Sequence, residues 1–282
     1  MPAIIHLVRH AQGYHNLSVE NEQMHDPDLT PLGEEQCSAL REAFGQEQHA
    51  KVKCLVASPL RRTLHTCILG FAPRLSEGEE EEQQQQQQQQ GQRGRVRVNP
   101  NLYPVRALDI LQEVSAEPCD TGSSTDRLAA EFGSRVDLTG VDDADWTDKT
   151  SGSSRFEPTA EKLTARAKEA RKVLRRIASE FGGEGVEEVH IVVVTHGGFL
   201  HFLTDDWTGI PQGKATGWSN CEYRSYQFVD STYKDDDAEL QETEGSWRRR
   251  SGSITRPTRT EQKEMGAVVQ DSLTPLLKLK VY

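Results

Sequence analysis

The chain has 282 residues, of which 35% are hydrophobic, so it can bury a sizeable core in one large α/β domain or two small ones. Its formal net charge is -11, which argues against a nucleic-acid partner because such a partner needs a basic face. The 5 cysteines are widely spaced, which is typical of free thiols in a reducing compartment. No signal-peptide pattern and no apolar run of roughly 18 residues is present, so we expect no membrane partner and a cytoplasmic location, with a nuclear one left open.

The first part of the chain predicts two strands, each followed by a helix. The apolar segment 3–8 predicts a buried strand. The Thr-Pro pair at 30–31 predicts the start of a helix, because threonine is a good N-cap and proline is favoured at the first helical position. Residues 52–57 predict a second strand, and the Ser-Pro pair at 58–59 predicts a helix that runs to about Phe71.

The middle of the chain breaks this pattern. Residues 76–95 are rich in glutamate and glutamine and contain no apolar side chain, so they predict a disordered insertion. Residues 96–98 could form a strand that resumes the fold. The polar segment 100–158 predicts a loop-rich cap with one short helix near 126–132.

The last part of the predicted domain again alternates helix and strand. Thr159 is expected to cap a long helix with an apolar stripe. Residues 189–195 form an uninterrupted apolar run, which is typical of a strand covered on both faces. A further helix is expected near Phe199, and residues 223–229 predict an edge strand.

This order predicts an α/β fold, a three-layer αβα sandwich with a mainly parallel central sheet and an inserted cap region. We expect one domain over residues 1–229. The polar segment 230–282 is expected to be a flexible tail whose apolar end could dock on the body.

Three segments place polar side chains just after a predicted strand: Arg9 with His10, residues 58–62, and His196. Ligands of open α/β sheets bind at the carboxyl ends of the strands, so these segments are expected to meet at one edge. A neutral imidazole can attack phosphorus, and a guanidinium can hold phosphate oxygens with two parallel hydrogen bonds. The amide of Asn16 could add another donor.

Each segment alone also has an ordinary explanation. An Arg-His pair can arise by chance, and Arg61 with Arg62 could be a surface pair. His196 could be a satisfied core histidine, and His201 is more consistent with packing inside a helix. Only the three segments together therefore predict a phosphate site.

Cleavage of a phosphate monoester also needs an acid that protonates the leaving oxygen. The loop-rich segment offers Glu113, Glu117 and Asp120. Each of them could instead be a solvated loop carboxylate, and the residues by themselves leave the choice open.

The ordered segments resemble the histidine phosphatase superfamily, which is also called phosphoglycerate-mutase-like. The family pattern R-H-x-x-x-x-x-N is found at 9–16, and S-x-L-x-R at 58–62. The family's second histidine before glycine corresponds to 195–198, and residues 29–36 are similar as well. The resemblance covers residues 3–229, in the family's order.

The resemblance implies two sets of site residues. The catalytic set is His10 as nucleophile, Glu113 as acid and base, and His196. The substrate-binding set is Arg9, Asn16 and Arg62. No cofactor and no metal site is expected, because the sequence has no recognisable metal-ligand motif.

The segment 118–122 departs from the Glu-Arg-His-Tyr-Gly segment of true phosphoglycerate mutases. We therefore expect a metal-independent phosphomonoesterase of the phosphatase branch, acting through phosphohistidine on a small phosphorylated metabolite. A phosphomutase remains an alternative, as does a non-catalytic phosphate-binding scaffold. His65 also departs from the family, where glutamine is common, and the oligomeric state is left open.

Overall fold

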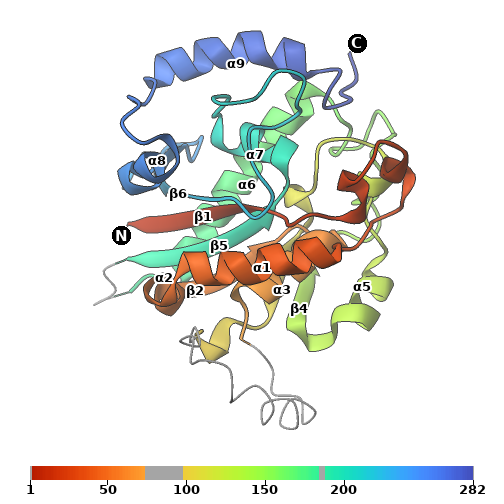
Figure 1. Ribbon diagram of the computed structural model, residues 1–282, viewed down its shortest axis with the longest axis horizontal. Helices are drawn as coiled ribbons and strands as arrows, with labels where there is room; N and C mark the ends of the chain where they lie inside the picture. Colours follow the sequence, from red (N-terminus) through yellow and green to blue (C-terminus); the bar gives the residue numbers. More distant parts are fainter. Residues whose placement is uncertain (1, 74–97, 184–187, 282) are drawn as a thin grey trace.

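The computed structural model describes residues 2–73, 98–183 and 188–281 (Figure 1). Its strands are β1 (Ala3–Arg9), β2 (Val52–Ala57), β3 (Val105–Leu108), β4 (Val136–Gly140), β5 (Val189–Thr195), β6 (Tyr223–Phe228) and β7 (Leu240–Glu242). They form a 7-stranded sheet in the order β4-β3-β2-β5-β1-β6-β7. From β4 to β1 along this order, neighbouring strands run parallel, whereas β6 and β7 each run antiparallel to the preceding strand.

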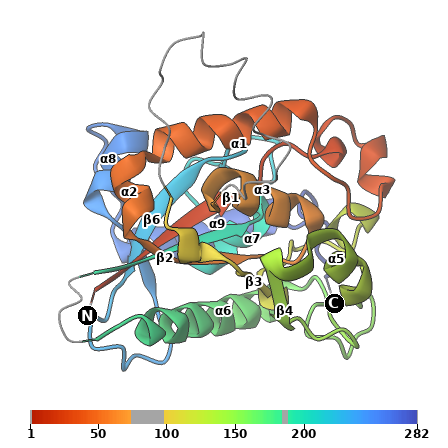
Figure 2. The same cartoon turned by 90° about the horizontal axis from the view of Figure 1, so that it is seen from below.

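Helices cover both faces of the sheet (Figure 2). One face carries α1 (Pro31–Phe44), α2 (Gln46–Lys51) and α3 (Arg61–Phe71), and the other carries α6 (Ala160–Glu180) and α7 (Gly197–Thr204). The remaining helices are α5 (Thr125–Phe132), α8 (Glu244–Ser251) and α9 (Arg259–Leu273). Short 3-10 helices are η1 (Tyr14–Asn16), η2 (Glu20–Gln23), η3 (Pro100–Leu102), η4 (Asp109–Leu111), η5 (Pro118–Asp120) and η6 (Gly133–Arg135).

The predicted α/β sandwich with a mainly parallel sheet is confirmed, and β5 shows why. Every residue of β5 is buried. Ile191 and Val193 belong to the core on the α6 and α7 side, whereas Val192 and Val194 belong to the core on the α1 and α3 side. A strand between two apolar layers needs apolar side chains on both faces, which explains its uninterrupted run.

Two of the predicted helix starts are confirmed by their caps. The hydroxyl of Thr30 accepts a hydrogen bond from the Gly33 amide at 3.0 Å. The hydroxyl of Thr159 accepts one from the Lys162 amide at 3.3 Å. The predicted cap at Ser58 is wrong, because α3 begins at Arg61 after Leu60 and has no side-chain cap.

The segment predicted as a loop-rich cap also contributes to the sheet. Residues 105–108 and 136–140 form β3 and β4, which extend the parallel sheet beyond β2. Their short length and mixed polarity hide them in the sequence, because both lie near an edge of the sheet. Residue 98, the described part of the possible strand 96–98, lies outside any strand. The predicted disordered insertion at 76–95 lies outside the described residues.

The segment predicted as a flexible tail is ordered where it is described, and this corrects the expectation. It supplies β7, so β6 is not the edge strand that was predicted. Leu240 and Trp247 are buried, and the Arg250 guanidinium bonds to Asp206 at 2.9 Å and to Glu242 at 2.8 Å. Ion pairs of this kind allow a polar sequence to pack without leaving buried charges alone.

Across the described ranges, no helix is both long enough and apolar enough to cross a bilayer.

Candidate active site

His10 lies directly after β1, and its backbone amide donates to the Thr195 carbonyl of β5 at 2.9 Å. Its Nδ1 lies 2.7 Å from the Ala11 carbonyl oxygen. A carbonyl only accepts, so Nδ1 carries the ring proton and Nε2 keeps a lone pair. Burial and the nearby Arg62 charge hold the pKa of His10 well below its ordinary value, so the ring is neutral.

A cavity of about 870 Å³ opens at this edge of the sheet. Four of the six predicted site residues line it, namely Arg9, His10, Asn16 and Glu113. The other two, Arg62 and His196, are completely buried behind its surface. The sheet therefore brings the predicted residues together, but in two layers.

Glu113 lies at the N-terminus of α7. Its carboxylate accepts hydrogen bonds from the amides of Gly198 at 3.2 Å, Phe199 at 2.9 Å and Val114 at 3.0 Å. Burial raises the pKa of Glu113, and the nearby Asp120 charge adds to the rise. A carboxyl that keeps its proton at higher pH suits a general acid.

The two rival carboxylates are both engaged with cations. Asp120 accepts from the Arg62 guanidinium at 2.8 Å and from the Ser115 hydroxyl at 2.5 Å. Burial favours protonation of Asp120, but Arg62 outweighs it, so the pKa lies below its ordinary value. Glu117 pairs with Lys278 at 3.1 Å, near the mouth of the cavity. Of the three candidates, Glu113 therefore has the environment of an acid.

Arg62 and His196 bond to each other behind the cavity surface. Arg62 donates to the Cys119 carbonyl at 2.6 Å, to Asp120, and to Nδ1 of His196 at 3.1 Å. Because a guanidinium only donates, His196 Nδ1 accepts, and Nε2–H donates to the Ser58 hydroxyl at 2.8 Å. Both terminal nitrogens of Arg62 thus have protein partners, and only its buried Nε has none among the described residues.

Arg9 and Asn16 each keep a donor that no group among the described residues accepts. Arg9 donates from one terminal nitrogen to the Trp218 carbonyl at 2.5 Å, whereas its buried Nε has no partner in the described part of the chain. The side-chain oxygen of Asn16 accepts from the Gly13 amide at 3.1 Å. That bond leaves the amide nitrogen of Asn16 to donate elsewhere.

Three further residues of the site were missed by sequence reasoning. His15 lines the cavity, and its position next to Asn16 in the first motif was the only signal for it. Ser58 was interpreted as a cap but accepts from His196. Lys149 is buried, with its pKa lowered to about 7 by burial, and donates to the Glu113 and Ser115 carbonyls, each at 2.9 Å. No sequence pattern marks that lysine.

The outer wall of the cavity, defined here as Glu22, Glu117 and residues 276–278, is built from loops and from the end of the described chain. The Lys278 ammonium forms ion pairs with both Glu22 and Glu117. These contacts fasten the segment after α9 to η2 and to the loop before η5. The outer wall thus depends on contacts between segments that lie far apart in the sequence.

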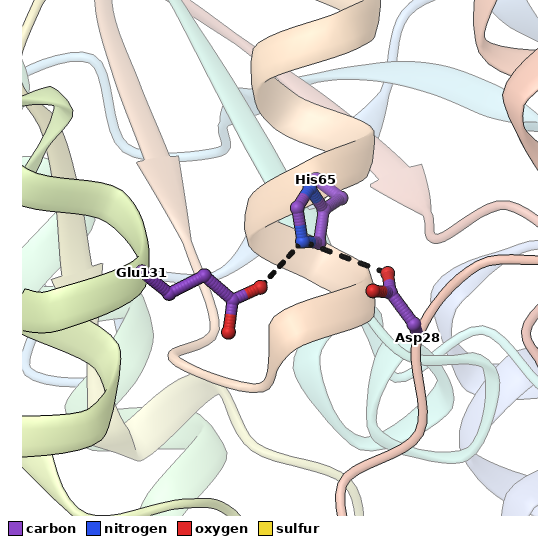
Figure 3. Close-up of side chains that lie close together, drawn as sticks. All are labelled: Asp28, His65 and Glu131. Carbon is purple, nitrogen blue, oxygen red and sulfur yellow. Dashed lines mark hydrogen bonds and ion pairs between the residues drawn. The ribbon is translucent and has the colours of Figure 1, made fainter.

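Asp28, His65 and Glu131 form a cluster whose ligand atoms lie within 4.8 Å of one another (Figure 3). His65 Nε2 lies 2.8 Å from Glu131 and 3.5 Å from Asp28. The Arg61 guanidinium already pairs with both carboxylates, at 2.7 Å and 2.6 Å. We interpret the cluster as an ion-pair network that joins α3 to α5, and none of its members lines the cavity. His65 therefore has a structural partner on each side.

Comparison with known proteins assigns the chain to a family. Residues 5–91 and 97–262 match the histidine phosphatase superfamily (branch 1), and the chain belongs to this superfamily, as the motifs predicted.

Two proteins of Arabidopsis thaliana are similar in sequence. One is described as "Phosphoglycerate mutase-like protein" and is 30% identical over 250 residues, which cover 80% of this chain and 84% of that protein. The other, "Phosphoglycerate mutase-like protein 1", is 28% identical over 256 residues, with 86% of each chain covered. Among solved structures, a mycobacterial glucosyl-3-phosphoglycerate phosphatase aligns with 20% identity and a TM-score of 0.47, over 86% of this chain and 97% of that one.

Proposed function

We propose that the protein is a metal-independent phosphomonoesterase that acts on small phosphorylated metabolites through a phosphohistidine at His10. The observation that carries this proposal is the state of His10. Its ring is neutral, and the Nδ1–H group donates a hydrogen bond to the Ala11 carbonyl. The residue lines a cavity together with Arg9 and Glu113. A fixed neutral imidazole beside a cation and a carboxyl of raised pKa is suited to nucleophilic attack on phosphorus.

In the first step, Nε2 of His10 forms a bond to phosphorus while the bond from phosphorus to the ester oxygen breaks. The Glu113 carboxyl gives its proton to that oxygen, so a neutral alcohol leaves. Arg9 and Asn16 hold the equatorial oxygens, where the negative charge is spread. Arg62 and His196 act from behind the cavity surface, since the terminal nitrogens of Arg62 and both ring nitrogens of His196 bond to protein groups.

In the second step, a water oxygen forms a bond to phosphorus and the bond to His10 breaks. Glu113 is now a carboxylate and takes the proton of the water. Inorganic phosphate leaves, and both residues return to their starting protonation states. A cationic side chain in the cavity supplies charge neutralisation that a metal ion provides in other phosphoryl-transfer enzymes.

A phosphomutase is the second candidate, because the two similar Arabidopsis thaliana proteins are described as phosphoglycerate mutase-like. A mutase must keep water from its phosphohistidine until the product is rephosphorylated. A cavity of about 870 Å³ that opens to solvent and the non-mutase segment 118–122 both support hydrolysis. The scaffold alternative is disfavoured because the full set of catalytic residue types is present.

A panel of phosphate monoesters, assayed with and without excess EDTA, tests the proposal. We expect release of inorganic phosphate that EDTA does not reduce, an acid-labile phosphoenzyme, and negligible interconversion of phosphoglycerates. Loss of turnover in EDTA with recovery in Mg²⁺ or Zn²⁺ would refute the metal-independent mechanism. Phosphoglycerate interconversion without phosphate release would establish the mutase instead.

A further inference from the structure

His15 lies in η1, shortly after His10 in the chain, and has no role in the two proposed chemical steps. Its ring lines the cavity, and its centroid lies 5.4 Å from that of His10. The ring is therefore a neighbour of the group that attacks phosphorus.

The ring of His15 lies against the backbone of Gly13, where no side chain occupies the space. A Cβ atom added to Gly13 would lie 2.8 Å from His15 Nδ1 and 3.1 Å from the Asp28 carbonyl. Any larger residue at this position would push the imidazole out of its place. The absence of a side chain at Gly13 therefore makes room for the His15 ring beside this backbone.

Neither ring nitrogen of His15 makes a hydrogen bond within the described part of the chain. Nδ1 is buried without a partner, so the edge of the ring that reaches the cavity is the Nε2 edge. Burial lowers the pKa of His15 to about 3, with the Arg62 charge as the next cause, so the ring is neutral at physiological pH. The tautomer with its proton on Nε2 puts a donor into the cavity and leaves only a lone pair at the buried nitrogen.

The cavity needs such a donor. Arg62 and His196 were assigned to the phosphate from the sequence. The terminal nitrogens of Arg62 and Nε2 of His196 instead donate to protein groups, and the remaining Nε of Arg62 is buried. A transferring phosphoryl group has three equatorial oxygens that must be stabilised.

We infer that His15 is a further substrate-contacting residue, whose Nε2–H donates a hydrogen bond to a non-bridging oxygen of the phosphoryl group as it passes to and from His10. This inference rests on the proposed function. His15 transfers no proton, and its contact is made in both chemical steps. Its contribution is therefore independent of the leaving group, which distinguishes it from the acid Glu113.

Two variants separate donation from packing. His15→Phe keeps a ring but removes the donor, whereas His15→Gln keeps an N–H donor and removes the ring. We expect His15→Phe to lower kcat/KM by about 10- to 100-fold, the usual range for one hydrogen bond to a charged group. The loss should be equal for alkyl and aryl phosphates. His15→Gln should recover a large part of the activity, and His25→Ala, at an exposed histidine outside the cavity, is the matched control.

The same variants are tested for binding of orthovanadate by calorimetry in EDTA. We expect binding to weaken by about 10-fold or more in His15→Phe, for the same reason. The inference is overturned if His15→Phe binds and turns over as the wild type does, or if His15→Gln is the more damaged variant. If His15→Phe fails to fold by circular dichroism, the nitrogen NMR signals of the wild-type histidines decide, because vanadate must perturb Nε2 of His15.

The two proposals can fail separately. If the wild-type protein bound vanadate through His15 but hydrolysed no monoester, the proposed function would be refuted. The proposed hydrogen bond from His15 to the phosphoryl group would still stand. An active wild type whose His15 variants are unaffected would refute the contact alone.

Discussion

The inner end of the cavity and its outer wall are built in different ways. At the inner end, His10 and His196 each follow a strand directly, and their polar atoms are fixed by short hydrogen bonds to Ala11, Ser58 and Arg62. The outer wall depends on Lys278, whose side chain is 40% exposed and bridges two loops. For the proposed reaction, we therefore expect the sheet to fix the chemistry and the outer wall to determine which alcohol fits.

Removal of the nucleophile is the strongest test of the inner end. We expect His10→Ala to lower kcat by roughly 10⁴-fold or more, because the covalent route is lost while the binding groups remain. The acid-labile phosphoenzyme should disappear, and circular dichroism should be unchanged. The exposed His25, changed to alanine, is the control for loss of a histidine elsewhere. A folded His10→Ala protein with a near-normal rate would mean that the chemistry is not performed here.

Glu113→Gln should give the next largest effect. For alkyl phosphates with poor leaving groups, we expect a fall in kcat/KM of about 10²- to 10⁴-fold, the usual contribution of general acid catalysis. An activated aryl phosphate should lose less. Because the pKa of Glu113 is raised, the wild-type kcat/KM should fall as pH rises through that pKa, and the variant should lack this alkaline limb. Equal losses for both esters would direct attention to Asp120 or Glu117.

Asp120→Asn tests whether the inner end is held by its buried ion pair. Loss of the carboxylate leaves the Arg62 charge without its partner, so we expect a loss of about 3 kcal/mol in the free energy of unfolding. Because the pKa of Asp120 lies below its ordinary value of 3.8, the pair stabilises the fold fully above that pH. The contribution is lost as pH falls through the lower pKa of the folded protein. Urea titrations at several pH values measure both effects, with Asp126→Asn, at an exposed aspartate, as control. If the difference in free energy of unfolding between the wild type and Asp120→Asn did not shrink in acid, the ion-pair explanation would be wrong.

Lys278→Ala should have the smallest effect and acts on the outer wall. A half-exposed ion pair contributes about 0.2–1 kcal/mol, so stability should barely change. The variant should change relative kcat/KM values between a small and a bulky monoester by up to about fivefold, since that range corresponds to 1 kcal/mol. Phosphate release from the smallest ester should be nearly normal. If kcat fell strongly for every substrate, the outer wall would take part in the chemistry.

The difference between the inner end and the outer wall also explains which elements could be predicted from the sequence. Strands β1, β2 and β5 were predicted because both of their faces are covered, which requires apolar runs. The inner site followed from residues placed directly after those strands. Strand β3 and the edge strands β4 and β7 are short and partly polar, so they give no such signal. The ion pairs of Lys278 with Glu22 join residues 256 positions apart, and no local pattern encodes that contact.

Local signals also had limits at the inner end. Ser58 was predicted as a cap from its sequence context, yet its hydroxyl is used by a histidine 138 positions away. Arg62 was expected to bind the phosphate, yet its guanidinium forms an ion pair with Asp120. In both cases the side chain was located correctly, but its partner is set by packing.

The anchoring of Glu113 fixes where its acidic proton can lie. Oε1 accepts from two amides, those of Val114 and Phe199, so both of its lone pairs are used. Among the described residues, Oε2 accepts only from Gly198 and keeps one lone pair. In the proposed reaction the proton is therefore held on Oε2, and the oxygen of the leaving alcohol must approach that atom. On this proposal the carboxyl defines one point of approach for the leaving oxygen, whatever the size of the rest of the substrate.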